Sequence, residues 1–155
     1  MEIRKAKKTD IPDILNLLSQ VLEVHAVLRP DLFVSGTRKY TEAELESILE
    51  NEKKPIFVAE DGGRIIGYCF CQLQSVMDSN DLRDSSSLFI DDFCVDEKSR
   101  HQHIGQLLND YVVQYAREIG CYDITLNVWE GNDSARAFYE RMGYTPRKTV
   151  MEKIL

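Results

Sequence analysis

Apolar residues recur at helical spacing in four stretches of this chain, and local start and stop signals bound them. These stretches predict helices over residues 9–22, 41–49, 104–119 and 132–142. Pro12 falls in the first turn of the first predicted helix, and Thr41 with Glu44 forms a capping box at the start of the second. Gly120 and Gly143 follow the last two helices and are typical of left-handed caps.

Alternating or continuous apolar runs predict strands between these helices. The predicted strands span residues 2–6, 55–60, 64–73, 87–95 and 122–128, and the segment 144–154 could hold a last one. Asp61-Gly62-Gly63 between two such runs is the signal of a tight hairpin turn. Pro30 and Gly36 interrupt the pattern over 25–40, and the polar stretch 78–87 is predicted to be a loop.

The order of these elements is strand, helix, helix, three strands, helix, strand, helix, strand. The strand–helix–strand unit at 87–128 predicts a right-handed parallel crossover, whereas the hairpin at 61–63 joins antiparallel strands. We therefore predict an α/β (α+β) fold with a mixed, mostly antiparallel central sheet and helices on both faces. No repeat or low-complexity linker interrupts residues 1–155, which favours a single domain.

The composition is that of an ordinary soluble protein and argues against two kinds of partner. The 155 residues include 26 acidic and 19 basic side chains, a net charge of −7, with 43% hydrophobic and 29% charged positions. This excess of acid is unsuited to neutralising many phosphates, so nucleic acid is not an expected partner. No apolar run approaches the roughly 18 residues of a membrane span, and the N-terminus lacks an apolar signal core. We expect a cytoplasmic protein with no membrane partner.

The four cysteines lie in or beside apolar runs, which is typical of small buried thiols in a reducing compartment. Cys69 and Cys71 could assemble a zinc site with His101 and His103, but no ligand spacing in the sequence supports it. We therefore expect no metal.

The strongest candidate site follows the predicted strand 87–95. A polar segment from Asp96 to His103 precedes an amphipathic helix, whose first amides have no partner inside the helix and lie at the positive end of its dipole. Such a helix start suits a phosphate or pyrophosphate group. Arg100 adds a cation, and Gly105 lets backbone come close to a ligand.

A second pattern is Asn132-x-x-Ala135-x-x-Phe138-Tyr139-x-x-x-Gly143-Tyr144. Alone it would describe a capped helix with an aromatic residue in the core. Together with Arg100-x-x-His103-x-Gly105, it resembles the two signature motifs of the GCN5-related N-acetyltransferase (GNAT) family. The predicted element order is similar to that of the family over essentially the whole chain. The resemblance implies the GNAT fold, acetyl-CoA as donor, an amine as the usual acceptor, and two parallel strands that splay apart to admit the pantetheine arm.

The resemblance also implies roles for individual residues. Backbone groups of Phe93 and Val95 would hold the pantetheine and polarise the thioester carbonyl, and Tyr139 would be the general acid. Asp91 and Asp92 are the candidate bases or cation-binding groups. Because neighbouring strand residues face opposite ways, only one of them, with Asp92 preferred, is expected to face the acceptor. The cofactor-binding set is Phe93, Cys94, Val95, Arg100, His101, Gln102, His103, Ile104, Gly105, Gln106, Asn132, Ala135 and Tyr139.

One position departs from the family pattern, because His103 stands where the pyrophosphate loop has its first glycine. Its side chain would crowd the phosphate, donate an imidazole N–H to it, or point to solvent, and the sequence leaves all three open.

The distribution of charge favours a cationic acceptor. Residues 78–97 contain seven acids and one base, and such a field attracts polyamines, aminoglycosides or lysine-rich segments. A solvated acidic loop explains the same residues equally well. His25, Phe33 and Tyr40 are candidate lining residues for the acceptor. A non-catalytic acyl-CoA sensor and an interaction domain with a degenerate site are the alternative functions, and a homodimer is a common assembly in the family.

Overall fold

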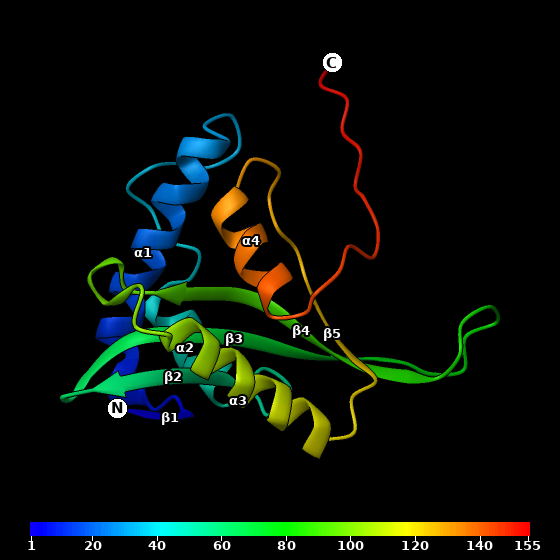
Figure 1. Cartoon of the computed structure of the whole chain (residues 1–155), viewed down its shortest axis with the longest axis horizontal. Coiled ribbons are helices and arrows are strands. Elements are labelled where there is room, and N and C mark those ends of the chain that lie inside the picture. Colours follow the sequence, from blue (N-terminus) through cyan, green and yellow to red (C-terminus); the bar gives the residue numbers. More distant parts are fainter.

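A computed structural model describes residues 1–155 and joins five strands in one sheet, in the order β1-β2-β3-β4-β5 (Figure 1). The strands are β1 (Glu2–Lys5), β2 (Ile56–Asp61), β3 (Arg64–Val76), β4 (Ser85–Val95) and β5 (Asp123–Leu126). Neighbouring strands from β1 to β4 are antiparallel, and β5 is parallel to β4. The predicted mixed, mostly antiparallel sheet is thereby confirmed.

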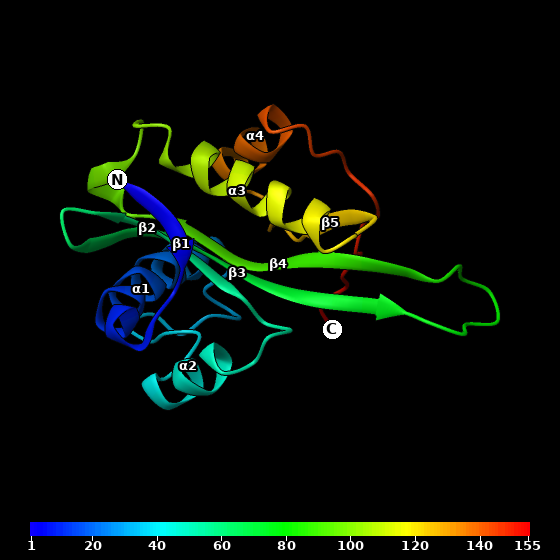
Figure 2. The ribbon, with the colours of Figure 1, turned by 90° about the horizontal axis from the view of Figure 1, so that it is seen from below.

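The helices cover both faces of this sheet, as predicted. They are α1 (Ile11–Leu28), α2 (Glu42–Leu49), α3 (Ile104–Glu118) and α4 (Asp133–Arg141), with short 3-10 turns η1 (Lys8–Asp10) and η2 (Glu97–Ser99). Figure 2 shows α1 and α2 on one face and α3 and α4 on the other. Each face has its own hydrophobic cluster: Leu18, Leu45 and Tyr68 belong to the first, and Phe57 and Leu108 to the second.

Local signals in the sequence place several element ends correctly. Thr41 accepts a hydrogen bond from the Glu44 amide (3.2 Å), and the Glu44 carboxylate accepts one from the Thr41 amide (2.7 Å), which completes the predicted capping box. Gly62 and Gly63 have φ values of +57° and +80°, the left-handed conformation that a two-residue hairpin turn requires at both positions. These ends depend only on neighbouring residues.

Helix α1 continues to Leu28, beyond the predicted end at residue 22. Ala26 is buried and extends the apolar stripe by another turn, and the helix stops at Arg29 because a residue before proline disfavours helical backbone. By length and composition, the segment Lys8–Leu28 is also long and apolar enough to cross a membrane. One face of this segment, which includes Ile14 and Leu17, is fully buried against the sheet, whereas Val24 and Val27 are exposed.

The expectation of a last strand within 144–154 is wrong. The chain after α4 forms no strand, and side chains such as Val150 and Met151 are almost fully exposed. Pro146 has no amide hydrogen for a sheet ladder, and residues 147–153 carry charged side chains that gain nothing from burial.

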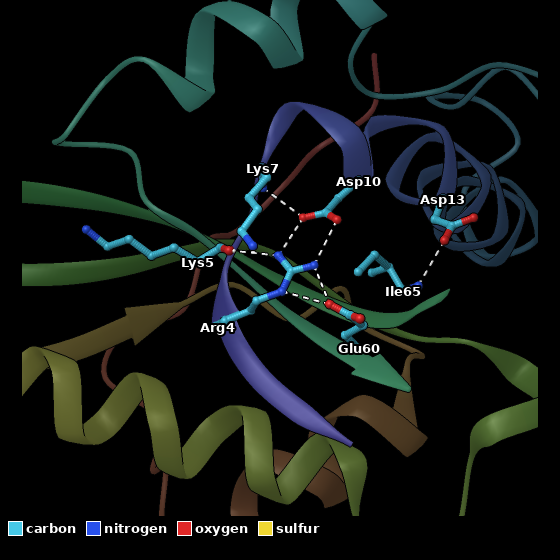
Figure 3. Close-up of polar contacts among 7 residues, drawn as sticks. All are labelled: Arg4, Lys5, Lys7, Asp10, Asp13, Glu60 and Ile65. Carbon is cyan, nitrogen blue, oxygen red and sulfur yellow. Dashed lines mark hydrogen bonds and ion pairs between the residues drawn. The ribbon is translucent and has the colours of Figure 1, made fainter. Parts of the chain in front are cut away.

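The N-terminal strand is fixed by a buried ion-pair network (Figure 3). Arg4 of β1 donates to Asp10 at 2.7 and 3.0 Å and to Glu60 of β2 at 2.8 Å, and Asp10 also accepts from the Lys7 amide at 2.7 Å. Burial raises the pKa of Asp10, but the Arg4 and Lys7 hydrogen bonds outweigh it, so the pKa lies below its ordinary value. Asp10 therefore ties β1 to α1 instead of capping the helix with its side chain.

Candidate active site

The parallel strands β4 and β5 separate partway along their length. They pair from Ser87 with Asp123 to Ile90 with Leu126, and no pairing follows. Beyond this point a cleft of about 1500 Å³ opens between residues 91–95 and 127–129. Side chains from both faces of the sheet line it, so the gap between the strands connects the α1 side of the molecule with the α4 side. This is the splayed pair that the family resemblance implies.

Backbone groups of β4 face this gap at alternate residues. The Asp96 amide donates to Ile66 O in β3 at 2.9 Å. Since hydrogen-bonding direction alternates along an antiparallel strand, Phe93 and Val95 direct their amide and carbonyl groups toward the opposite edge, where β5 has separated. Here the Phe93 amide donates to Asp92 Oδ1 (3.0 Å), and Val95 O accepts from Arg100 Nε (3.4 Å).

The loop before α3 presents an uncapped helix N-terminus to the cleft. His103 is the N-cap residue, with φ +59°, and no side chain caps the helix. The first helical hydrogen bond runs from the Leu107 amide to His103 O, so the preceding amides of α3 have no partner in the protein. His101 (φ +65°) and His103 both adopt the left-handed backbone typical of glycine. The predicted anion-binding geometry is therefore present, with histidines at glycine-like positions.

Gly105 has a structural role in addition to the ligand approach expected from sequence. A Cβ atom there would lie 3.1 Å from the Phe138 ring and 3.7 Å from the Val95 side chain. The missing side chain therefore lets the first turn of α3 pack directly against α4 and β4. This packing brings α3, α4 and β4 into contact beside the cleft.

Helix α4 positions Tyr139 over the gap. Asn132 accepts a hydrogen bond from the Ala135 amide at 3.3 Å and so acts as the helix cap. The Tyr139 ring packs against Phe138 and Tyr144, with centroid distances of 5.1 and 5.5 Å. The residue lines the cleft. Burial raises the pKa of Tyr139 well above its ordinary value, which keeps the phenol protonated.

Asp91 and Asp92 lie on the same face of the sheet, contrary to the expectation that only one faces the acceptor. Phe70 pairs with Asp92 while the next residue of β3, Cys71, pairs with Ile90. Asp91 is thus the extra residue of a β-bulge, and a bulge breaks the strict alternation of side chains. Both carboxylates lie on the α1 side of the cleft.

The two carboxylates have different partners. Asp91 accepts from Lys39 Nζ at 3.0 Å and from the Tyr40 hydroxyl at 2.5 Å. Asp92 has no ion pair and accepts from the Tyr68 hydroxyl at 3.3 Å. Burial, opposed by Lys39 and reinforced by Asp91, raises the pKa of Asp92 to about 6. Asp92 is therefore the carboxylate poised to exchange a proton near neutral pH.

The α1 side of the cleft contains two residues that sequence reasoning did not single out. Lys39 is one, and only its long-range contact with Asp91 reveals it. Trp129 is the other. It is the only tryptophan in the sequence and directly follows the predicted strand 122–128, and that position could have marked it as a candidate lining residue. The Phe33 ring packs edge-on against Trp129, with centroids 5.4 Å apart, and at a tilt against His25, with centroids 5.1 Å apart. Two of the predicted lining residues, His25 and Phe33, are thereby in contact. Tyr40 lies behind Asp91 and is not part of the lining.

Some predicted residues lie elsewhere. Gln102 is exposed between the two left-handed histidines and does not line the cleft. The acids from the predicted loop, Asp78, Asp81 and Asp84, lie near the tip of the β3–β4 hairpin, which Figures 1 and 2 show projecting away from the rest of the molecule. Only Asp91 and Asp92 of the acidic stretch line the cleft.

The four residues considered for zinc are not brought together as a metal site. Cys69 and Cys71 are buried in the cluster beneath α3, with their sulfur atoms 3.6 Å apart. His101 and His103 are exposed in the loop before α3. No group of three or more metal-binding side chains occurs in the structure.

Comparisons with known proteins agree with this geometry. The sequence profile of the acetyltransferase (GNAT) family matches residues 21–144. The uncharacterized N-acetyltransferase YhfO of Bacillus subtilis (strain 168) is 31% identical over 144 residues, covering 93% of this chain and 89% of its own. A crystal structure of a mutant BH1408 protein from Bacillus halodurans has a TM-score of 0.96 and 29% identity, covering 100% of this chain and 99% of its own. This chain therefore belongs to the GNAT family.

More distant structures share the fold. The aminoglycoside N-acetyltransferase AAC(6')-Iy, solved in complex with CoA, has a TM-score of 0.75 and 18% identity, covering 99% of this chain and 98% of its own. At that identity the likeness supports the fold alone.

Proposed function

We propose that this protein is an acetyl-CoA-dependent N-acetyltransferase that acts on a primary amine. The observation that carries the proposal is the splayed strand pair, which places Tyr139 on one side of a single cleft and Asp92 on the other. Family membership supports acyl transfer and, with it, acetyl-CoA as the donor.

The residues at the α3–α4 end of the cleft fit acetyl-CoA. The unpartnered amides at the start of α3 and the nearby Arg100 suit the pyrophosphate. The free edge of β4 at Phe93 and Val95 suits the amide groups of a pantetheine arm, which would add to it as a short strand does. For the pantetheine arm to bind there, Arg100 would give up its hydrogen bond to Val95 O.

Acyl transfer to an amine requires a neutral nucleophile, a donor for the developing oxyanion, and a proton for the leaving thiolate. Acetyl-CoA supplies the thioester when bound. Asp92, with a pKa of about 6, accepts the proton of the incoming ammonium, either directly or through water. The Phe93 amide leaves Asp92 Oδ1 and donates to the thioester carbonyl oxygen. As the amine nitrogen bonds to the acetyl carbon, the C–S bond breaks, Tyr139 protonates the thiolate, and the resulting phenolate takes up the proton that the new amide nitrogen loses.

The test compares Tyr139→Phe with the parent protein. The phenylalanine keeps the ring packing and deletes the one transferable proton. Loss of a general acid lowers kcat by about 10²–10⁴-fold, with acetyl-CoA binding nearly unchanged. Acetyl-CoA binding is followed by thermal stabilisation, and turnover by thiol release with a panel of primary amines. Arg100→Ala is the companion variant, and it weakens acetyl-CoA binding without that drop in kcat.

These measurements also separate the alternative functions. Stabilisation by acetyl-CoA with no thiol release from any amine would favour a non-catalytic sensor. Absence of both would favour an interaction domain. A Tyr139→Phe rate within about threefold of the parent would remove Tyr139 from the mechanism.

A further inference from the structure

The acceptor half of the cleft, on the α1 side, has walls that are mostly apolar. They include Val21, Leu22, Phe33, Phe89 and Trp129. Phe33 and Trp129 come from segments far apart in the sequence and meet edge-on, so they bridge the α1–α2 loop and the loop after β5. A substrate body in this space would contact hydrocarbon and aromatic surface over most of its length.

The charged groups of this half-cleft are few and largely matched. Lys39 Nζ lies 3.0 Å from the Asp91 carboxylate and 3.1 Å from the Asp91 carbonyl oxygen. The Tyr40 hydroxyl completes the shell of Asp91. Burial, with the nearby Lys39, lowers the pKa of His25, so this imidazole is neutral at pH 7. Asp92 is the one carboxylate that no cation neutralises.

We infer that Lys39 restricts the acceptor to amines that carry a single positive charge and an apolar body. The inference rests on the proposed N-acetyltransferase function and specifies its substrate class. The Lys39 ammonium occupies Asp91 and leaves one carboxylate, Asp92, for the reacting amine. A second substrate ammonium would meet the like charge of Lys39 or the apolar walls, and both are unfavourable.

This inference differs from the polycationic acceptor that the acidic stretch in the sequence favoured. Asp78, Asp81 and Asp84 lie away from the cleft and do not line it. Within the cleft, Lys39 cancels the charge of one of the two remaining acids. The local field therefore attracts one cation.

The experiment uses two acceptors of the same length that differ in one group, hexylamine and 1,6-diaminohexane. Thiol release from acetyl-CoA gives kcat/KM for each. We expect the parent protein to prefer hexylamine by about tenfold or more. The second ammonium of the diamine would lie against the apolar walls or near the like charge of Lys39. Lys39→Gln frees Asp91 to bind that charge, and we expect the preference to shift toward the diamine by about tenfold.

Two further variants make the result specific. Lys39→Gln combined with Asp91→Asn removes the freed carboxylate, and the preference for hexylamine should return. Lys53→Gln alters an exposed lysine outside the cleft and should leave the ratio of the two acceptors unchanged. The ratio cancels general effects on folding or on acetyl-CoA binding, because both acceptors are measured on the same protein.

Two outcomes would overturn the inference. One is a parent protein that uses 1,6-diaminohexane better than hexylamine, and the other is an acceptor ratio unmoved by Lys39→Gln. If neither amine reacts, binding of each to the acetyl-CoA complex is compared by thermal shift, and no preference for hexylamine there overturns it too. Thiol release with any other amine would leave the proposed function standing, whereas failure to release thiol with every amine would defeat that function itself.

Discussion

Two side chains with raised pKa values line this cleft. Asp92 is a buried carboxyl whose pKa is raised to about 6, while Tyr139 is a phenol kept protonated by burial. One accepts a proton near neutral pH and the other holds one. Both residues line the same cleft: Tyr139 comes from α4, and Asp92 comes from β4 and lies on the α1 side of the sheet.

The first prediction concerns Asp92→Asn. Without the carboxylate, kcat/KM should fall by about 10²-fold or more, and the rise in kcat/KM with pH near 6 should disappear. The free energy of unfolding of the parent protein should change with pH in the opposite direction to its kcat/KM. A carboxyl whose pKa is raised in the folded state binds protons preferentially there, so the stability of the parent protein falls as pH rises from about 4 to 6.

The asparagine variant lacks this titration, so its stability relative to the parent should rise from pH 4 to 6 and exceed that of the parent at pH 8. The gain is at most about 3 kcal/mol for a shift of this size. Chemical denaturation at pH 4, 6 and 8 measures it. A variant that is less stable than the parent at pH 8 would contradict the raised pKa.

A second prediction concerns His103. Its backbone is left-handed, which costs an L-residue about 1–2 kcal/mol and costs glycine little. His103→Gly should therefore be more stable than His103→Ala by about 1 kcal/mol in thermal melts. Because the side chain is exposed, acetyl-CoA affinity should stay within about threefold of the parent. A tenfold loss of affinity would instead show that the imidazole donates to the phosphate.

The sequence identifies most residues of the cleft but not how they pair. The two family motifs place Tyr139, Arg100 and Gly105 because each motif is a short continuous segment, one in the loop and first turn of α3 and the other in α4. The relation of Asp91 to Asp92 depends on a bulge opposite β3 that no local pattern encodes. The role of Lys39 could not be predicted for a similar reason, because its partner, Asp91, lies on a strand distant in the sequence.

Between elements, the contact of α3 with α4 is sensitive to a small change at Gly105. Gly105→Ala would place a methyl group 3.1 Å from the Phe138 ring. Overpacking of this kind costs about 1–3 kcal/mol, and relief requires α4 to move away from α3. We expect a lower Tm and weaker acetyl-CoA binding. An alanine variant with parent-like values for both would show that the ring adjusts without moving the helix.

Element ends separate what neighbouring residues determine from what tertiary contacts determine. The capping box at Thr41 and the hairpin at Gly62 follow from local chemistry, and both are confirmed. The extension of α1 beyond residue 22 depends on burial of Ala26 against the rest of the fold, and the sequence pattern missed it. Residues 144–154 form no strand because they pair with no neighbouring strand, and the sequence pattern of one segment does not show whether such a neighbour exists.

At the scale of the whole molecule, the two proposed substrate sites are the two halves of one cleft, which lie on opposite sides of the sheet. The α3–α4 side offers unpartnered amides and a free strand edge, and the α1 side offers Asp92 within apolar walls. They meet only through the gap left where β5 separates from β4. A single irregularity in the sheet therefore creates a channel that no individual helix or strand contains.

This channel has a kinetic consequence. The one thiol that lines it, Cys94, is poorly suited to carry the acetyl group between two half-reactions, because burial raises the pKa of that thiol to about 12. Both substrates must therefore be present together, and initial-rate plots at several fixed amine concentrations should give intersecting lines. Incubation with acetyl-CoA alone should leave the intact mass of the protein unchanged. Parallel lines, or a covalently acetylated Cys94, would show that the acetyl group pauses on the protein on its way through the sheet.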